Sequence, residues 1–106
     1  MATYLLLANW TDQGARSAAS TIERLRKARS ILEGAGVTLL DVYWTLEAYD
    51  VVLIVDSPDE MSLFGSVIRV TAAGNLRICT TRAFTEPEMQ AAIMRSTTIH
   101  ENVTLP

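Results

Sequence analysis

The chain has 106 residues, which is long enough for one hydrophobic core and too short for two domains. Hydrophobic residues make up 49% of it, a high share for a small protein whose surface must stay wet, so part of the apolar surface is expected to meet another subunit. The net charge of -3, with no basic patch, argues against nucleic acid as a partner.

Membranes and cofactors are not expected either. The longest apolar run, Tyr4 to Ala8, is far too short to span a bilayer, and the start of the chain lacks a basic signal region. The single Cys79 has no internal disulfide partner, which suits a reducing compartment. His100 has no companion ligands in the sequence around it, so no metal is expected. The composition therefore predicts a cytoplasmic protein without a cofactor.

The first half of the chain predicts a strand and a helix. Apolar and aromatic residues over 3–9 indicate a strand, because a polar cluster ends the run abruptly. Ser20 and Glu23 have the spacing of a capping box, which predicts a helix over about 21–33. The expected apolar stripe of that helix is Ile22, Leu25, Ala28 and Leu32.

Two further strands are predicted over 37–46 and 50–56, joined by a short hairpin connection. The run Ser57-Pro58-Asp59-Glu60 combines an N-cap serine with a proline at the first helical position, and predicts a helix over 58–73. The residues expected to face the core from this helix are Met61, Phe64, Val67, Ile68 and Thr71.

The last part of the chain predicts a strand over 76–84, followed by a short helix. Thr85 and Glu88 form another capping box, and the helix is expected to run to about Arg95. Residues 96–106 show no periodicity, so we expect an extended tail, docked on a neighbouring molecule.

The predicted order βαββαβ plus a terminal helix is that of an α+β, ferredoxin-like fold, with one domain over 1–95 and a tail over 96–106. Two main helices cover only one face of a four-stranded antiparallel sheet. The strands are nevertheless apolar at successive positions, as in Leu5 and Leu6 or Val52 and Leu53. A second copy covering the other face would give a dimeric α+β barrel, so we expect a homodimer or higher homo-oligomer.

Several motifs, taken in order, resemble the GYD-domain family, whose members are small bacterial and archaeal proteins of the dimeric α+β barrel superfamily. The resemblance covers roughly residues 3–95 and implies the fold strongly, whereas the family is largely uncharacterised in function. The motifs are Asn9-Trp10-Thr11-Asp12-Gln13-Gly14, Tyr49-Asp50, Ser57-Pro58-Asp59-Glu60, Gly74-Asn75-Leu76-Arg77 and Arg82-Ala83-Phe84-Thr85.

The chain departs from the family at the hairpin before Tyr49-Asp50. The family is named for a glycine shortly before Tyr-Asp, and here Glu47 and Ala48 occupy those positions. If the glycine supplied a positive φ, this chain makes the turn differently or accepts strain of about 1 kcal/mol or more at one of the two residues.

Strands one and three of this fold are adjacent and antiparallel. We therefore expect the cluster at the end of the first strand, which is Asn9, Trp10, Asp12 and Gln13, to lie close to Tyr49 or Asp50. The alternative for the first group is that Thr11 or Asp12 caps a turn through its side chain. The alternative for Asp50 is that it accepts hairpin amides or pairs with Arg77 or Arg82. The candidate ligand-binding residues are Asn9, Trp10, Asp12, Gln13, Tyr43, Tyr49, Asp50, Arg77 and Arg82.

Two functions remain open from the sequence, and no catalytic residue is identified. The first is a homo-oligomeric module that binds a small molecule or serves as an accessory subunit. The second, by analogy with superfamily relatives, is a cofactor-independent enzyme, monooxygenase-like or isomerase-like, acting on a small aromatic or lactone-like substrate. An apolar cavity holding a desolvated Asp or Tyr would favour the enzyme, and exposed Asp12 and Asp50 would favour the module.

Overall fold

The computed structural model describes the backbone of residues 1–102 and the side chains of residues 1–97. The first 83 residues form four strands and two long helices in the order βαββαβ, together with a short helix, and one further long helix follows. The elements are β1 (Ala2–Trp10), α1 (Asp12–Arg16), a 3-10 turn (Ala18–Ser20), α2 (Thr21–Gly34), β2 (Thr38–Trp44), β3 (Val51–Ser57), α3 (Glu60–Ala72), β4 (Leu76–Ala83) and α4 (Glu86–Asn102).

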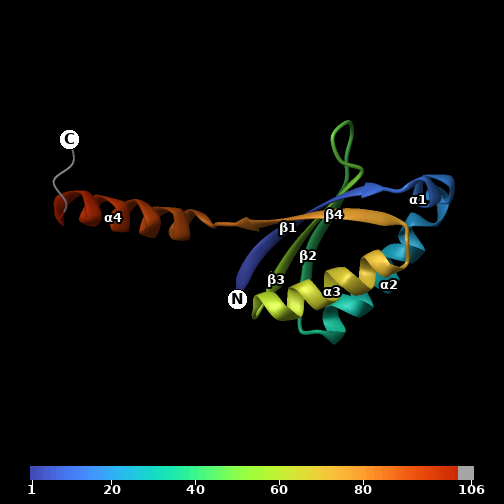
Figure 1. The fold of residues 1–106 in the computed structure, drawn as a ribbon, viewed down its shortest axis with the longest axis horizontal. Coiled ribbons are helices and arrows are strands. Elements are labelled where there is room, and N and C mark those ends of the chain that lie inside the picture. The colour runs from blue at the N-terminus through green and yellow to red at the C-terminus, as the bar shows by residue number, and fades with distance from the viewer. Residues whose placement is uncertain (103–106) are drawn as a thin grey trace.

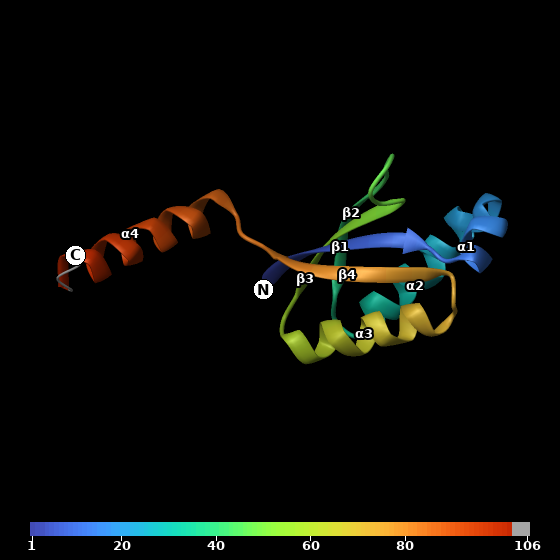
Figure 2. The ribbon, with the colours of Figure 1, turned by 45° about the horizontal axis from the view of Figure 1, so that its top comes forward.

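The four strands form one sheet in the order β2-β3-β1-β4, and every neighbouring pair is antiparallel. Helices α2 and α3 lie side by side against the same face of this sheet (Figures 1 and 2). This arrangement confirms the predicted α+β, ferredoxin-like fold.

The core lies between the sheet and these two helices. Alternate residues of the central strands β1 and β3 point into it, and Leu6 is only 2% exposed. Leu32 of α2 and Leu63 of α3 pack against them from the helix layer. The buried hydrophobic strand residues of this covered face are Tyr4, Leu6, Ala8, Leu39, Val51, Leu53 and Val55.

The other face of the sheet carries no helix of the described chain. The intervening residues of β1 and β3 point to it and are half-buried, and the antiparallel register sets them opposite one another. We call this the open face and define it by its central aliphatic residues Leu5, Leu7, Val52 and Ile54. The predicted two-sided apolar character of the sheet is therefore confirmed.

Between β1 and α2 the local structure differs from the prediction in two ways. The polar cluster after β1 forms the short helix α1, whose N-cap Thr11 accepts a hydrogen bond from the Gly14 amide. Ser20 precedes α2 but makes no side-chain cap, because it ends the 3-10 turn that leads directly into the helix. The predicted capping box at Ser20 is thus wrong, although the helix lies close to its predicted bounds, and Ile22 at its start is largely exposed.

Helix α3 begins two residues later than predicted and buries a different face. Its N-cap is Asp59, which accepts a hydrogen bond from the Ser62 amide at 2.6 Å, while Ser57 is buried in β3. Met61 and Ile68, predicted to face the core, are 76% and 53% exposed, and Phe64 is exposed as well. Leu63 and Ser66 are buried instead. The apolar residues of this helix are distributed over most of its circumference, so periodicity alone did not select the face that meets the sheet.

Helix α4 begins at the predicted capping box. The Thr85 amide donates to Glu88 Oε1 at 2.9 Å, and the Glu88 amide donates to Thr85 Oγ1 at 3.3 Å. The helix continues to Asn102, so the expected extended tail is wrong over 96–102, and residues 103–106 lie outside the described residues. The domain boundary at residue 95 stays a prediction.

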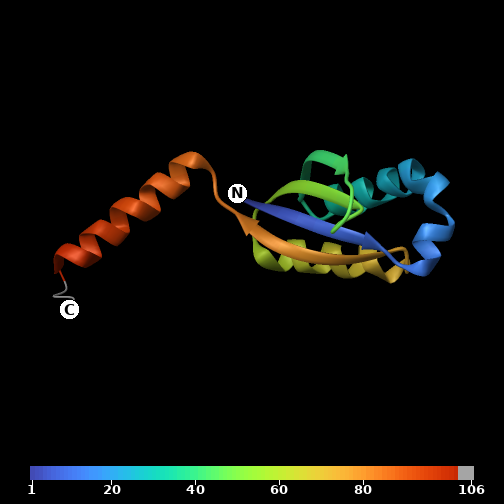
Figure 3. The same ribbon diagram turned by 90° about the horizontal axis from the view of Figure 1, so that it is seen from above.

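Helix α4 also projects away from the rest of the molecule (Figure 3). The molecule therefore measures 57 × 31 × 20 Å, and its radius of gyration is 17.2 Å. A compact chain of this length has a radius of gyration of about 13 Å. The side chain of His100, which the sequence placed in the tail, lies outside the described side chains.

The hairpin between β2 and β3 shows the consequence of the missing family glycine. Glu47 adopts a φ of 68°, the left-handed region that favours glycine. The hairpin is closed by Thr45, whose amide donates to the Asp50 carbonyl at 2.9 Å and whose hydroxyl donates to the Tyr49 carbonyl at 2.7 Å. Of the two positions where strain was expected, Glu47 is the one with a positive φ.

Candidate functional site

The end of β1 and the start of β3 meet as predicted. The Trp10 amide donates to Asp50 Oδ2 at 2.9 Å, and the Asp50 amide donates to the Ala8 carbonyl at 2.9 Å. The half-buried Asp50 carboxylate therefore holds the last residue of β1 in place. Its observed role is structural, since one of its oxygens is already engaged by a backbone amide.

The polar cluster after β1 is also engaged within the fold. Gln13 Nε2 donates to the Ala73 carbonyl and to Asn75 Oδ1, both at 3.0 Å, which ties α1 to the turn between α3 and β4. Gly14 lies against the same turn, where a Cβ atom would come within 2.1 Å of the Asn75 carbonyl oxygen. Asp12 is exposed at the first position of α1.

Other candidate residues gather on the open face. Asn9 lies opposite Arg77 in the register of β1 and β4, at the same end of the sheet as Asp50. Tyr43 of β2 is exposed, and its hydroxyl donates to Asp41 Oδ2 at 2.8 Å. This hydrogen bond to a carboxylate raises the pKa of Tyr43, because ionisation would place a second negative charge beside Asp41. Tyr49 is half-buried in the hairpin.

Arg82 lies apart from the other candidates. It is opposite Tyr4 in the register, at the far end of the sheet from Asp50, and it faces the helix side. Its guanidinium forms an ion pair with Glu88 at 2.8 Å and lies 4.3 Å from the centre of the Phe84 ring. The alternative of an Asp50 ion pair with Arg82 is therefore wrong, because the register separates the two residues. No ion pair joins Arg77 to Asp50 among the described side chains.

Glu88 carries a strongly lowered pKa, about 2 instead of its ordinary 4.5. The largest cause is the hydrogen bond that its carboxylate accepts from the Thr85 amide, and the Arg82 hydrogen bond adds to it. The ionised carboxylate is thus part of the junction between β4 and α4.

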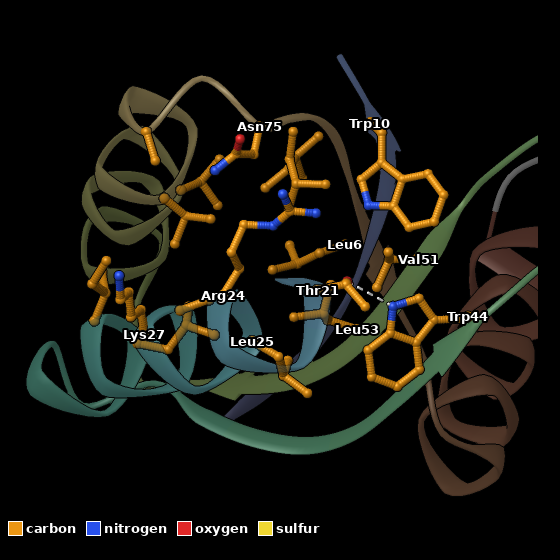
Figure 4. Close-up of a pocket in the computed structure, with 18 residues that line it drawn as sticks. Leu6, Trp10, Thr21, Arg24, Leu25, Lys27, Trp44, Val51, Leu53 and Asn75 are labelled. Carbon is orange, nitrogen blue, oxygen red and sulfur yellow. Dashed lines mark hydrogen bonds between the residues drawn. The ribbon is translucent and has the colours of Figure 1, made fainter. Parts of the chain in front are cut away.

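The sequence did not predict a cavity between α2, α3 and the covered face of the sheet. Its volume is about 170 Å³. Trp10 from the end of β1 and Trp44 from the end of β2 line it, and the Trp44 indole donates to Thr21 Oγ1 of α2 at 3.0 Å (Figure 4). Leu6, Val51 and Leu53 contribute the wall on the side of the sheet.

The cavity is apolar inside and positively charged at its edge. Arg24 and Lys27 of α2 line it together with the polar side chains of Thr21 and Asn75. No Asp, Glu, His, Cys or Tyr belongs to the lining within the described part of the chain. The spacing of Arg24 could have predicted its place in the lining. Arg24 lies four residues before the core residue Ala28 and therefore on the same face of α2.

No group of three or more His, Cys, Asp or Glu side chains within the described residues forms a candidate metal site. None of the helices in the described part of the chain is long and apolar enough to cross a membrane. As ligand-binding residues, the nine sequence candidates stay predictions.

Comparison with known proteins gives a family and a fold. The model of the GYD domain matches residues 4–93. A protein of Thermus thermophilus named "Glutamine synthetase and cystathionine beta-lyase binding protein" is 26% identical over 94 residues, which are 88% of this chain and 99% of that protein. The crystal structure of MtbAldR superposes with a TM-score of 0.62 at 21% identity, over 80% of this chain and 54% of that one. This chain thus spans about half of that solved chain, and the likeness concerns the fold.

Proposed function

Because this chain belongs to the GYD-domain family, we propose that it is a homo-oligomeric accessory module that associates with other proteins. The observation that carries the proposal is the open face, an apolar sheet surface that no described helix covers. Sheets with helices on one side and aliphatic residues on the other need a second cover.

A second copy of the chain suits the open face. The four aliphatic residues at its centre, Leu5, Leu7, Val52 and Ile54, are flanked by polar side chains such as Tyr43 and Arg77. An apolar centre with a polar rim is the usual composition of a protein interface. Burial of apolar surface contributes about 25 cal/mol per Å², and a two-fold axis lets one self-complementary face cover its own copy.

Helix α4 offers a second surface for association. Met89 and Ile93 lie one helical turn apart and are exposed, and Phe84 just before the helix is exposed as well. The helix is about 25 Å long at 1.5 Å per residue, and it extends away from the domain. An exposed apolar stripe on a projecting helix is a suitable element for contact with another protein.

The name of the relative supports this function and suggests the first partners. That Thermus protein is named for binding glutamine synthetase and cystathionine beta-lyase, and the alignment covers nearly all of it. We therefore include association with enzymes of these two kinds in the proposal for the present chain.

The alternative of a cofactor-independent enzyme receives less support. Such an enzyme needs a group that accepts or donates a proton beside its substrate. The cavity has no carboxyl, imidazole, thiol or phenol group in its described lining. Asp12 is exposed, whereas Asp50 is half-buried and accepts a hydrogen bond from the Trp10 amide. The geometry therefore favours binding over catalysis.

The homo-oligomer is tested by measuring mass in solution by light scattering. The parent is expected to form a dimer or a multiple of dimers at micromolar concentration. Ile54→Asp on the open face should shift the mass to that of a monomer, because it introduces a charge into the centre of the interface. Ile68→Asp on the exposed side of α3 is the matched control and should leave the mass unchanged. A monomeric parent would contradict this part of the proposal.

Association with enzymes is tested by titrating purified glutamine synthetase and cystathionine beta-lyase from the source organism onto the immobilised protein. Saturable binding of at least one of them is expected. Ile93→Asp in α4 should weaken that binding, whereas Ile22→Asp on the exposed side of α2 should not. Absence of binding to both enzymes would overturn the proposed partners, independently of the oligomer result.

A further inference from the structure

We propose that the cavity between α2, α3 and the covered face binds a small organic anion, one aromatic or branched apolar group that carries a carboxylate. The apolar group would fill the cavity and Arg24 would hold the carboxylate at its edge. This site is separate from the open face, so it goes beyond the accessory function and does not depend on it.

The size and the walls of the cavity suit one ring. Its volume is about 170 Å³, and an engineered apolar cavity of about 150 Å³ in another protein stays dry and binds benzene. The walls are two indole rings and aliphatic side chains such as Leu6 and Ile78. Apolar walls of this kind favour an apolar occupant over ordered water, because they offer a water molecule too few hydrogen-bonding partners.

The positive charge at the edge of the cavity favours an anionic ligand. Arg24 is half-buried, and its guanidinium donates to the Ser17 hydroxyl and, at 3.2 Å, to the Gly14 carbonyl. Both acceptors are neutral, so these bonds orient the guanidinium without neutralising it. Neither Arg24 nor Lys27 has an ion pair among the described side chains. A carboxylate at this edge would therefore meet the half-buried, positively charged Arg24 guanidinium, while the exposed Lys27 adds a more solvated positive charge to the lining.

The walls are also held in place before any ligand arrives. The Trp44 indole is tied to Thr21, and the Trp10 amide is tied to the Asp50 carboxylate. Figure 4 shows Arg24 extending from α2 toward the side of the cavity where Trp10 and Asn75 lie. A preformed site of this kind avoids the cost of ordering its side chains on binding.

The tryptophans provide a direct readout, because the chain contains only two and both line the cavity. We would titrate the protein with phenylacetate and, separately, with phenylacetamide, while recording tryptophan fluorescence. The two probes share their ring and nearly their shape, but only the first carries a charge. Phenylacetate should change the emission saturably, and phenylacetamide should bind at least tenfold more weakly. No saturable change with phenylacetate, or equal affinity for the two probes, would overturn the proposal.

A matched pair of variants then tests Arg24. Arg24→Gln removes the guanidinium and should weaken phenylacetate binding about tenfold or more, with little effect on phenylacetamide. Arg26→Gln removes the same charge two residues along α2, at an exposed position outside the lining, and should leave the affinity unchanged. Equal weakening by both variants would indicate general attraction of anions and contradict a specific site. If Arg24→Gln does not fold, the comparison of the two probes on the parent protein still tests whether the site prefers an anion.

The outcome is separable from the accessory function. The cavity lies within one subunit, so Ile54→Asp should bind phenylacetate with the affinity of the parent even when its mass is that of a monomer. Loss of phenylacetate binding in a folded Ile54→Asp variant would contradict a site confined to α2, α3 and the covered face.

Discussion

The packed domain over Ala2–Ala83 and helix α4 are stabilised in different ways. In the domain, α2 and α3 owe their positions to a shared core with the sheet, which includes Leu32 and Leu63. Helix α4 depends on its own capping box and on the Arg82–Glu88 ion pair, and it extends away from the core. A local signal is thus enough to define a helix, but it does not provide a surface for that helix to pack on.

This difference predicts whether a substitution affects global unfolding or only local opening. Changes within the domain should alter the free energy of global unfolding, because its elements share one core. Changes in α4 should alter the local opening of that helix and leave the global transition nearly unchanged.

The largest expected effect is in the core. Leu6→Ala removes a side chain that is 2% exposed in the central strand, and should lower the free energy of unfolding by about 2–5 kcal/mol. Ile93→Ala in α4 is the control and should change it by less than about 0.5 kcal/mol. Denaturant unfolding measures both. An Ile93→Ala effect as large as that of Leu6→Ala would show that α4 unfolds together with the domain.

The next effect is at the junction of β1 and β3. Asp50→Ala leaves the half-buried Trp10 amide without its charged acceptor, and should cost about 1.5–3 kcal/mol of the free energy of unfolding. Asp12→Ala, at the exposed start of α1, should cost less than about 0.5 kcal/mol. A normal melting temperature for Asp50→Ala would show that this carboxylate is not a structural element of the domain.

A smaller effect, of the opposite sign, is expected in the hairpin. Glu47→Gly relieves the positive φ at this position and should raise the free energy of unfolding by about 0.5–1 kcal/mol. Ala48→Gly, at the neighbouring position without a positive φ, should lower it slightly because glycine adds entropy to the unfolded chain. Thermal unfolding of the two variants, compared with the parent, distinguishes these outcomes.

The smallest effect is confined to α4 and depends on pH. The pKa of Glu88 is lowered in the folded chain to about 2 from 4.5, so its ionised form stabilises the start of the helix above about pH 4.5. That contribution should be lost progressively as the pH falls from about 4.5 to about 2. Hydrogen exchange of the α4 amides should therefore show increased opening over this range after correction for intrinsic rates. Glu88→Gln should remove the pH dependence, and an unchanged dependence in that variant would assign it to another group.

Features that depend on neighbours in the sequence were predictable. The strands, the capping box at Thr85 and the βαββαβ order all follow from patterns a few residues long. The contact between Trp10 and Asp50 followed from the fold, because its topology makes strands one and three antiparallel neighbours. The glycine missing before Tyr49-Asp50 likewise pointed to strain at Glu47 or Ala48, and the structure has the positive φ at Glu47.

Features that depend on shape or on register needed the tertiary structure. The buried face of α3 was not predictable, because Leu63 and Phe64 are both apolar and only contact with the sheet selects between them. The partner of Arg82 was decided by the register, which sets this residue at the Tyr4 end and Glu88 within reach. The cavity beside Trp44 is a gap that α2, α3 and the sheet leave between them. Periodicity records which residues are apolar, whereas the space between packed elements depends on side chains far apart in the sequence.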